Sequence, residues 1–235
     1  MYMFKFIVAG FLLLLNLQAD NKEALKAFKN SDYAKAFKLY EQNAKKGDST
    51  AQSALSYLYA NGLGVDKNIK ESLYWLEKSA QGDNSAAQYD LGMMYLSGQN
   101  VQKDTKKAFE LLNKSSKQNN PNAQYNLALM YYKGDGVDLN VTKTANLLES
   151  AALNGHKGAQ QNIGMVYMQL LEFDKAASWF EKAAANGDES VYYLLAESYC
   201  QLEKFDKAKV WAQKAMDMGD TQAELLYKEK ELSKY

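Results

Sequence analysis

The sequence predicts an all-α protein, an α-solenoid built from stacked helix-turn-helix units. The main observation is a phrase of twelve residues that begins again every 36 residues: AQSALSYLYANG (51–62), AQYDLGMMYLSG (87–98), AQYNLALMYYKG (123–134) and AQQNIGMVYMQL (159–170). In each copy an Ala, a Leu or Ile, and a Tyr follow one another at intervals of four, which places them on one face of a helix. One such unit cannot bury its apolar face alone, whereas stacked copies form a continuous core.

A second helical pattern follows each copy and supplies a partner helix. Its large apolar residues recur in pairs: Trp75-Leu76, Leu111-Leu112, Leu147-Leu148, Trp179-Phe180 and Trp211-Ala212. The connecting loops NGLGV (61–65), SGQNV (97–101) and KGDGV (133–137) carry Gly, or Asn100, which tolerate the left-handed conformation that ends helices. An N-cap candidate stands three residues beyond the Val of each loop: Asn68, Asp104 and Asn140.

Residues 1–19 are expected to be a signal peptide. Lys5 precedes an apolar run from Phe6 to Leu15, and Ala19 is a small residue suited to cleavage. A membrane span needs about 20 apolar residues, so this run is too short for one. We therefore expect cleavage near Ala19, a periplasmic or secreted protein, and no integral membrane segment after cleavage.

The mature chain, residues 20–235, is expected to be a single α-solenoid domain. Residues 20–50 predict a degenerate N-terminal capping repeat, because their first helix lacks the Leu-small-Tyr pattern. Residues 51–158 predict three repeats of 36 residues, and 159–222 predict two of 32 residues, with QLLEFDKA and QLEKFDKA in place of the Gly-rich loop. Residues 223–235 predict a C-terminal capping helix. Degenerate units at both ends are expected, since terminal repeats shield the stack from water.

These residues resemble the repeat of Sel-one-like proteins of the exported bacterial type, which are related to tetratricopeptide repeats. The pattern AxxxLGxxYxxGxGVxxDxxKAxxWxxKAAxxG is matched well over 51–158, and the two later units look more like tetratricopeptides. Local departures include Asn100 in place of Gly and Glu71 in place of Lys. The resemblance implies a right-handed superhelix that serves as an adaptor for other proteins, often in bacterial envelopes.

The composition gives no support to nucleic-acid binding or to catalysis. All 28 basic residues are Lys, and Arg is the usual residue for bidentate phosphate and base recognition. The single His156, within the turn NGHKG, is expected to be solvated and makes neither a triad nor a zinc site. Cys200 has no partner for a disulfide within the chain and is expected to be a packing residue. Glu110, Glu149 and Glu181 alternate with Lys on the second helices and are expected to lie on solvated faces, and no cofactor or metal is predicted.

One enzymatic alternative comes from the resemblance itself. Some cysteine-rich Sel-one-like proteins have been described as penicillin-binding or β-lactamase-like. This chain lacks their paired cysteines and has no S-x-x-K or K-T-G motif. Its nearest fragments are Ser115-Ser116-Lys117 and Lys143-Thr144-Ala145.

The resemblance also indicates where a partner would bind. Tetratricopeptide-like stacks line their concave side with first helices, and the inward positions in this sequence include Tyr57, Tyr89, Met93, Tyr125, Tyr132, Met165, Met168 and Tyr193. Tyr offers contact area at low entropic cost, and Met repacks against varied partners. The alternative is that each residue only packs the scaffold. We expect a monomer that binds a protein or peptide of unknown identity in this groove, and no nucleic acid.

Overall fold

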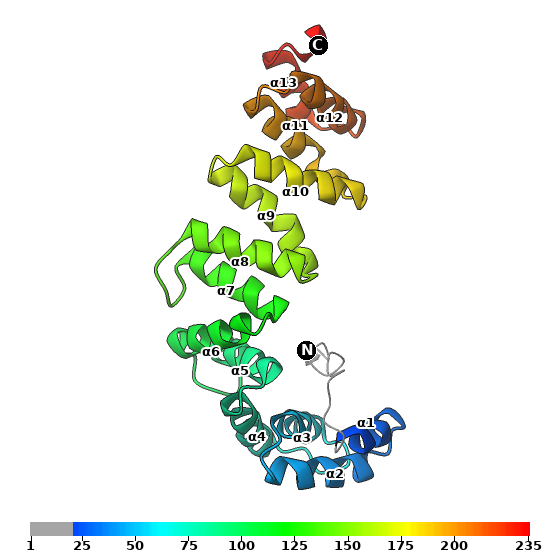
Figure 1. Cartoon of the computed structure of the whole chain (residues 1–235), viewed down its shortest axis with the longest axis vertical. Coiled ribbons are helices and arrows are strands. Elements are labelled where there is room, and N and C mark those ends of the chain that lie inside the picture. Colours follow the sequence, from blue (N-terminus) through cyan, green and yellow to red (C-terminus); the bar gives the residue numbers. More distant parts are fainter. Residues whose placement is uncertain (1–20) are drawn as a thin grey trace. The chain divides into compact units, whose positions relative to one another are not determined.

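The computed structural model describes residues 21–235, apart from the side chain of Gln161. The predicted signal peptide, residues 1–19, lies outside the described residues. Over residues 21–235 the regular structure consists of α-helices and short 3₁₀ turns, with no strand (Figure 1). The prediction of an all-α solenoid is confirmed.

The chain divides into two compact units, the first of which ends at Ala123. Within this unit each helix packs against the next one along the chain, so that the helices pair as the first and second members of repeats. The first helices are α1 (Lys22–Lys29), α3 (Ser49–Asn61) and α5 (Ser85–Ser97). The second helices are α2 (Tyr33–Lys45), α4 (Ile69–Gln81) and α6 (Thr105–Lys117).

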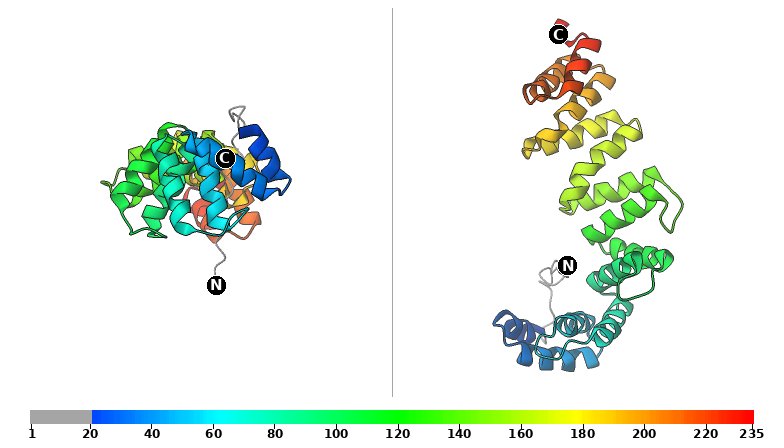
Figure 2. Two further views of the ribbon diagram at one scale, coloured as in Figure 1. Left: turned by 90° about the horizontal axis from the view of Figure 1, so that it is seen from below. Right: turned by 180° about the vertical axis from the view of Figure 1, so that it is seen from behind.

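The second unit runs from Gln124 to Tyr235. Its first helices are α7 (Pro121–Lys133), α9 (Lys157–Gln169), α11 (Tyr192–Gln201) and α13 (Thr221–Glu229). Its second helices are α8 (Val141–Leu153), α10 (Phe173–Ala185) and α12 (Phe205–Asp217). The 3₁₀ turn η3 (Glu189–Val191) precedes α11, and a second one, η4 (Leu232–Lys234), follows α13. Figure 2 gives two further views of these helix pairs.

The predicted N-caps begin the second helices. The Asn68 side chain accepts hydrogen bonds from the backbone N–H groups of Lys70 and Glu71, at 3.0 and 3.2 Å. Asp104 and Asn140 cap α6 and α8 in the same way. These contacts satisfy N–H groups that have no partner within the helix.

Small residues let the paired helices approach closely, as the sequence predicts. A Cβ atom on Gly164 in α9 would lie 2.4 Å from the Phe180 ring in α10. Gly64, with φ of +72°, brings its loop against the backbone of α2, where a Cβ would lie 2.2 Å from the Tyr33 carbonyl oxygen. Asn100 takes the left-handed conformation with φ of +57°. Only small or left-handed-tolerant residues fit at these positions.

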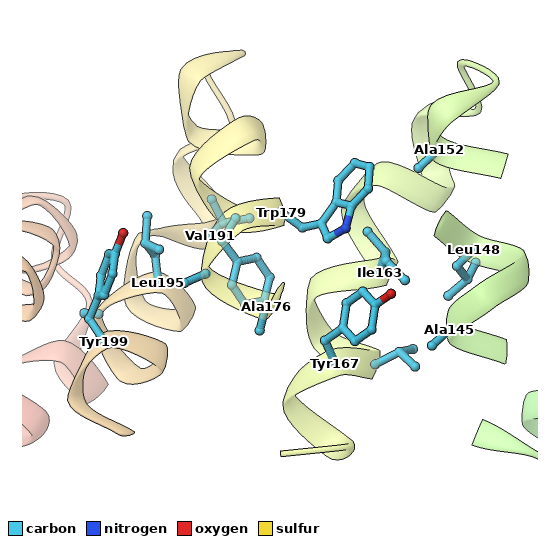
Figure 3. Close-up of a cluster of buried hydrophobic side chains, with 14 of the residues drawn as sticks. Ala145, Leu148, Ala152, Ile163, Tyr167, Ala176, Trp179, Val191, Leu195 and Tyr199 are labelled. Atoms are coloured by element: carbon cyan, nitrogen blue, oxygen red, sulfur yellow. The ribbon is translucent and has the colours of Figure 1, made fainter. Parts of the chain in front are cut away.

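The largest buried cluster lies in the second unit (Figure 3). Ile163 and Tyr167 of α9 are covered by Leu148 of α8 on one side and Trp179 of α10 on the other. Leu195 of α11 occupies the position of Ile163 in the next repeat, and it is fully buried as well. Equivalent residues of successive repeats therefore build one continuous core.

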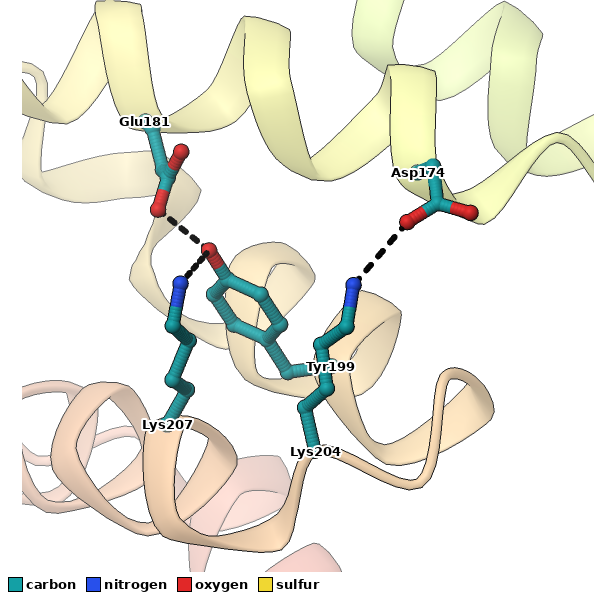
Figure 4. Close-up of polar contacts among 5 residues, drawn as sticks. All are labelled: Asp174, Glu181, Tyr199, Lys204 and Lys207. Atoms are coloured by element: carbon teal, nitrogen blue, oxygen red, sulfur yellow. Dashed lines mark hydrogen bonds and ion pairs between the residues drawn. The ribbon is translucent and has the colours of Figure 1, made fainter.

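Polar contacts join neighbouring repeats at the edge of this core (Figure 4). Tyr199 of α11 donates a hydrogen bond to Glu181 of α10, and the Lys207 ammonium lies 5.0 Å from the centre of its ring. One repeat earlier, Tyr167 donates to Glu149 at 3.0 Å. Glu181 is exposed, as the sequence predicts, and Glu149 is partly buried. Both also accept a hydrogen bond, because a buried Tyr ring needs a partner for its hydroxyl group.

The C-terminal end differs from the predicted capping helix. Helix α13 ends at Glu229, and Glu231 takes a left-handed conformation with φ of +49°. The chain then turns back so that Leu232 is completely buried against α12 and α13, while Tyr235 stacks on Phe205 with ring centres 4.8 Å apart. Burying a Leu contributes about 1.5–3 kcal/mol, which outweighs the ~1–2 kcal/mol cost of one left-handed residue.

Candidate functional site

Every first helix turns one face away from its second helix, and we call this the first-helix face. On α5 the residues Ala87, Leu91 and Met94 are buried, whereas Tyr89 and Met93 on the opposite side are partly exposed. The face is defined by Tyr57 on α3, by Tyr89, Asp90 and Met93 on α5, by Tyr125 and Tyr132 on α7, by Met165 and Met168 on α9, and by Tyr193 and Glu197 on α11. This definition includes the eight residues that the sequence predicts for partner binding.

In the first unit the predicted residues on this face are partly buried. Tyr57 meets the ring of Phe28 edge-on, with the centres 6.0 Å apart. Tyr89 and Met93 lie one turn apart on α5 and share its exposed side. Phe28, which no repeat signature marks, thus extends the aromatic surface onto α1.

In the second unit Tyr125 is held from two directions. Its ring stacks on the His156 imidazole with the centres 4.1 Å apart, and its hydroxyl oxygen accepts a hydrogen bond from Asn162 at 3.1 Å. His156 is therefore not the solvated turn residue that the sequence predicts. It is partly buried and caps α9, because its Nδ1 atom accepts a hydrogen bond from the Ala159 N–H at 3.0 Å. Burial lowers the pKa of His156.

Tyr132, two turns further along α7, is the most exposed of the predicted tyrosines, at 39%. Its hydroxyl oxygen accepts a hydrogen bond from Gln169 of α9 at 3.0 Å. Both contacts between α7 and α9 join residues 37 apart, the distance that separates facing positions of consecutive first helices. The sequence carried this signal, because Asn162 and Gln169 stand at that spacing after the two tyrosines.

The remaining predicted residues divide into exposed and packed ones. Met165 on α9 is 44% exposed. Met168 and Tyr193 are partly buried and pack against the core of the second unit. The structure thus brings Tyr125, Tyr132 and the α9 methionines onto adjacent helices, whereas Tyr193 lies on the next first helix, α11.

Two carboxylates lie on the first-helix face: Glu197 stands at one of the inward positions that the resemblance implies, whereas Asp90 escaped the sequence prediction. Burial raises the pKa of Asp90 on α5 to about 7, and it also raises the pKa of Glu197 on α11. A signal for them was present, since Asp90 is the only charged residue of α5 and Glu197 the only one of α11. An isolated charge on an otherwise neutral helix is a reason to look for function.

The fragments nearest to hydrolase motifs have structural roles. Ser115 is completely buried, and its hydroxyl group donates a hydrogen bond to the Ser85 carbonyl oxygen at 2.7 Å. The Thr144 hydroxyl group donates to the Asn140 carbonyl oxygen at 2.9 Å within α8. Burial raises the pKa of the Cys200 thiol, which disfavours the reactive thiolate form. The prediction that Cys200 packs in the interior is confirmed by its burial.

Other features were sought over the described part of the chain. Among residues 21–235, no three His, Cys, Asp or Glu side chains lie close enough together to hold a metal ion. None of the helices described has both the length and the apolar character needed to cross a membrane. A surface cavity of about 270 Å³ lies beside Gln160, Trp179 and Lys182 in the second unit.

Comparisons with known proteins agree with this architecture. The Sel1 repeat matches residues 27–48, 49–84, 85–120, 121–156, 159–188 and 191–220. A search of proteins with curated descriptions finds no significant match.

Solved structures show the same fold. A Sel1 repeat protein from Oxalobacter formigenes is 25% identical with a TM-score of 0.66, over 88% of this chain and 86% of that one. A protective antigen of uropathogenic Escherichia coli with an SLR fold, c5321, is 28% identical with a TM-score of 0.66. That alignment covers 81% of this chain but 43% of the antigen, so the chain spans less than half of that protein's length. Because the six matched stretches make up well over half of the sequence, the chain belongs to the Sel1 repeat family, whose members are generally scaffolds for protein–protein interaction and typically not enzymes.

Proposed function

We propose that the protein is an exported scaffold that binds a protein or peptide partner on its first-helix face. The observation that carries the proposal is the composition of this face, where tyrosines and methionines lie exposed or partly exposed on helices almost free of charge. Helix α6, by contrast, carries Lys106, Lys107, Glu110, Lys114 and Lys117. Enrichment in Tyr and Met together with depletion of charge is typical of the centre of protein interfaces.

The geometry of Tyr125 and Tyr132 adds support. Their hydroxyl groups are fixed by Asn162 and Gln169, and the Tyr125 ring is fixed by His156. Side chains that are already ordered lose less conformational entropy when a partner binds. These two tyrosines are therefore the proposed anchors of the partner in the second unit.

Export is proposed from the sequence of residues 1–19, with their apolar run and the small residue Ala19. The protein is then periplasmic or secreted and acts on a partner in the cell envelope or beyond it. N-terminal sequencing of protein from the envelope fraction is expected to begin at Asp20 or within a few residues of it. Recovery of the chain with an intact Met1 from the cytoplasm would contradict export.

The binding proposal is tested by removing the two anchors together. We expect the Tyr125→Ala, Tyr132→Ala double variant to keep its helical circular-dichroism spectrum and to recover much less partner from envelope extract, since about 1–2 kcal/mol for each anchor weakens the affinity roughly 30-fold or more. Tyr74→Ala is the matched control, since Tyr74 is a 49% exposed tyrosine on the second helix α4. Equal recovery by the folded double variant and this control would refute the proposal.

A further inference from the structure

One helix pair of the second unit, α9 and α10, has a surface cavity of about 270 Å³. Its lining residues are Gln160, Trp179, Lys182, Ala183, Ala185 and Asn186. Figure 3 shows Trp179 extending from α10 toward α9. Since a cavity of about 150 Å³ is enough to hold benzene, this one has room for a single aromatic ring.

Two earlier repeats bridge the corresponding position with a pair of side-chain amides. In the repeat of α5 and α6, the Gln118 amide donates a hydrogen bond to the Gln88 oxygen at 2.8 Å. In the repeat of α7 and α8, the Asn154 amide donates to the Gln124 oxygen at 3.0 Å. Both bonds join the second residue of the repeated Ala-Gln pair to the residue that follows the second helix.

The repeat of α9 and α10 has the same two amides but lacks the bridge. Gln160 and Asn186 stand at these positions, and Trp179 stands where the two earlier repeats have Leu. The Gln160 amide donates instead to the Ala152 carbonyl oxygen at 3.1 Å, and the Asn186 side chain makes no hydrogen bond to any other described residue. The cavity therefore lies at a position that the earlier repeats span with their own side chains.

The last repeat, of α11 and α12, fills the same position with an aromatic ring. Tyr192 stands 32 residues after Gln160, and Trp211 stands 32 residues after Trp179. The rings of Tyr192 and Trp211 are in contact, with their centres 5.4 Å apart. The Lys214 ammonium lies 4.0 Å from the centre of the Trp211 ring and 5.8 Å from that of Tyr192.

The Trp and Lys of the last repeat have direct counterparts at the cavity. The Lys182 ammonium lies 4.0 Å from the centre of the Trp179 ring, the same distance as in the last repeat. Trp179 is only 7% exposed, so its position is already fixed before anything binds. A ring that enters the cavity would contact an ordered indole and lie near a cation, and both contacts are favourable.

We propose that this cavity receives the aromatic side chain of a partner polypeptide. The inference rests on the proposed function and adds to the anchors Tyr125 and Tyr132 a separate contact on α9 and α10. The chain's own Tyr192 carries the argument, because it shows which chemical group fills this position beside a Trp–Lys pair. The Gln160 oxygen and the Asn186 amide are free to bond a phenol hydroxyl or the peptide groups beside the ring.

The first test uses the purified protein and p-cresol, the side-chain analogue of tyrosine. The three tryptophans give three indole N–H signals in a ¹⁵N NMR spectrum, and single Trp-to-Phe variants assign them. We expect p-cresol to shift the Trp179 signal saturably and to leave the Trp211 signal unchanged, because Tyr192 already lies against Trp211. The saturated analogue 4-methylcyclohexanol has no π-face for Lys182 and is expected to bind about two- to fivefold more weakly.

Reciprocal variants exchange the open and the filled position. Gln160→Tyr supplies the ring from within the chain and is expected to abolish the shift at Trp179. Tyr192→Gln removes the ring from the last repeat and is expected to make the Trp211 signal respond to p-cresol. Circular dichroism verifies that each variant is folded, and Gln160→Tyr decides alone if Tyr192→Gln loses helicity. Unchanged binding of p-cresol at Trp179 in folded Gln160→Tyr would overturn the inference.

Partner recovery from envelope extract then distinguishes this inference from the proposed function. Gln160→Tyr is expected to recover several-fold less partner than the parent, whereas Gln222→Tyr, which adds the same ring at an exposed position of α13, is expected to match the parent. Binding of p-cresol with full recovery by Gln160→Tyr would assign the cavity to a free aromatic molecule and overturn the partner contact. No response of Trp179 to p-cresol would also overturn the inference, while the Tyr125→Ala, Tyr132→Ala variant still tests the proposed function by itself.

Discussion

At the scale of single residues, the most informative side chains are those whose ionisation is shifted by burial. Asp90 and His156 both lie at the first-helix face or directly behind it, and burial favours the neutral form of each. For His156 the neutral form is useful, because its unprotonated Nδ1 atom caps α9. For Asp90 no ion pair within residues 21–235 compensates the ionised form, so the ionised carboxylate destabilises the folded protein.

Replacing Asp90 is expected to stabilise the free protein above neutral pH. The folded-state pKa of about 7 is above the ordinary value of 3.8, so the folded protein holds this proton more tightly than the unfolded chain. That contribution to stability is fully present below about pH 3.8 and is lost as pH rises toward 7. We expect Asp90→Asn to raise the free energy of unfolding by roughly 2–4 kcal/mol at pH 8 and by much less at pH 5. Urea melts at the two pH values measure this, and a lower stability than the parent at pH 8 would contradict it.

His156 is expected to make the second unit sensitive to acid. Its folded-state pKa is lowered from 6.5, so the unfolded chain takes up the proton first. The contribution to stability is complete above pH 6.5 and is lost as pH falls below that value. His156→Asn keeps an N-cap side chain and removes the titration. Thermal melts from pH 7.5 to pH 5 are expected to show a smaller loss for this variant than for the parent, and two parallel curves would show that the cap does not titrate.

At the scale of helices, the two helices of a pair pack closely together, and hydrogen bonds at the edge of the core join one pair to the next. Gly164 allows Phe180 to lie against α9, and Tyr167 and Tyr199 seal the edge by donating to Glu149 and Glu181 of the preceding second helix. The links span 18 residues, which is the distance between a second helix and the next first helix in this part of the chain. Packing inside a pair and polar contacts between pairs therefore act on the same helices.

Because α9 and α10 approach closely at Gly164, we expect replacement of this glycine by alanine to destabilise the protein. In an exposed helix this change is favourable by about 0.8–1 kcal/mol, because Ala is the better helix former. At Gly164 the new methyl group would lie 2.4 Å from the Phe180 ring, and overpacking of this kind costs about 1–3 kcal/mol. We expect Gly164→Ala to lower the urea midpoint and Gly164→Ala, Phe180→Leu to lose less than the sum of the single changes. Additive losses would mean that the two residues do not compete for space.

At the scale of the whole molecule, stability in a repeat protein is the sum of local contributions from neighbouring units. Residues that are covered on all sides contribute most, and residues on the closing helix contribute least. Leu127 in α7 is 2% exposed, whereas Leu225 in α13 is 59% exposed. The contribution of each leucine to stability therefore depends on how far the neighbouring helices cover it.

Leu127→Ala is expected to cost about 2–5 kcal/mol of unfolding free energy, because it removes a buried side chain and leaves a cavity. Leu225→Ala is expected to cost less than about 0.5 kcal/mol, as is usual for exposed positions. Urea melts of the two variants under identical conditions make the comparison. Similar losses would show that the repeat register assigned to these leucines is wrong.

The sequence by itself determined the helical repeats, the loops and the caps. Leu, Tyr and small residues at intervals of four, Gly or Asn100 in the loops and the N-caps such as Asn68 act on neighbours within one or two helical turns, so a local pattern is sufficient to predict them. The resemblance to tetratricopeptide-like repeats, and not the local pattern, implied the inward positions of the predicted tyrosines and methionines, and it could not say which of them are exposed.

Only the tertiary structure decided which polar groups meet. Tyr125 bonds to Asn162, Tyr199 to Glu181, and Leu232 folds back beneath the last helices, all at distances that depend on how one repeat is offset from the next. The burial that shifts the pKa of Asp90 is likewise a property of packed helices, since the same residue would be solvated on an isolated α5. Hydrogen-bond partners and desolvation are set by three-dimensional neighbours, and a periodic sequence pattern specifies those neighbours only down to the level of whole helices.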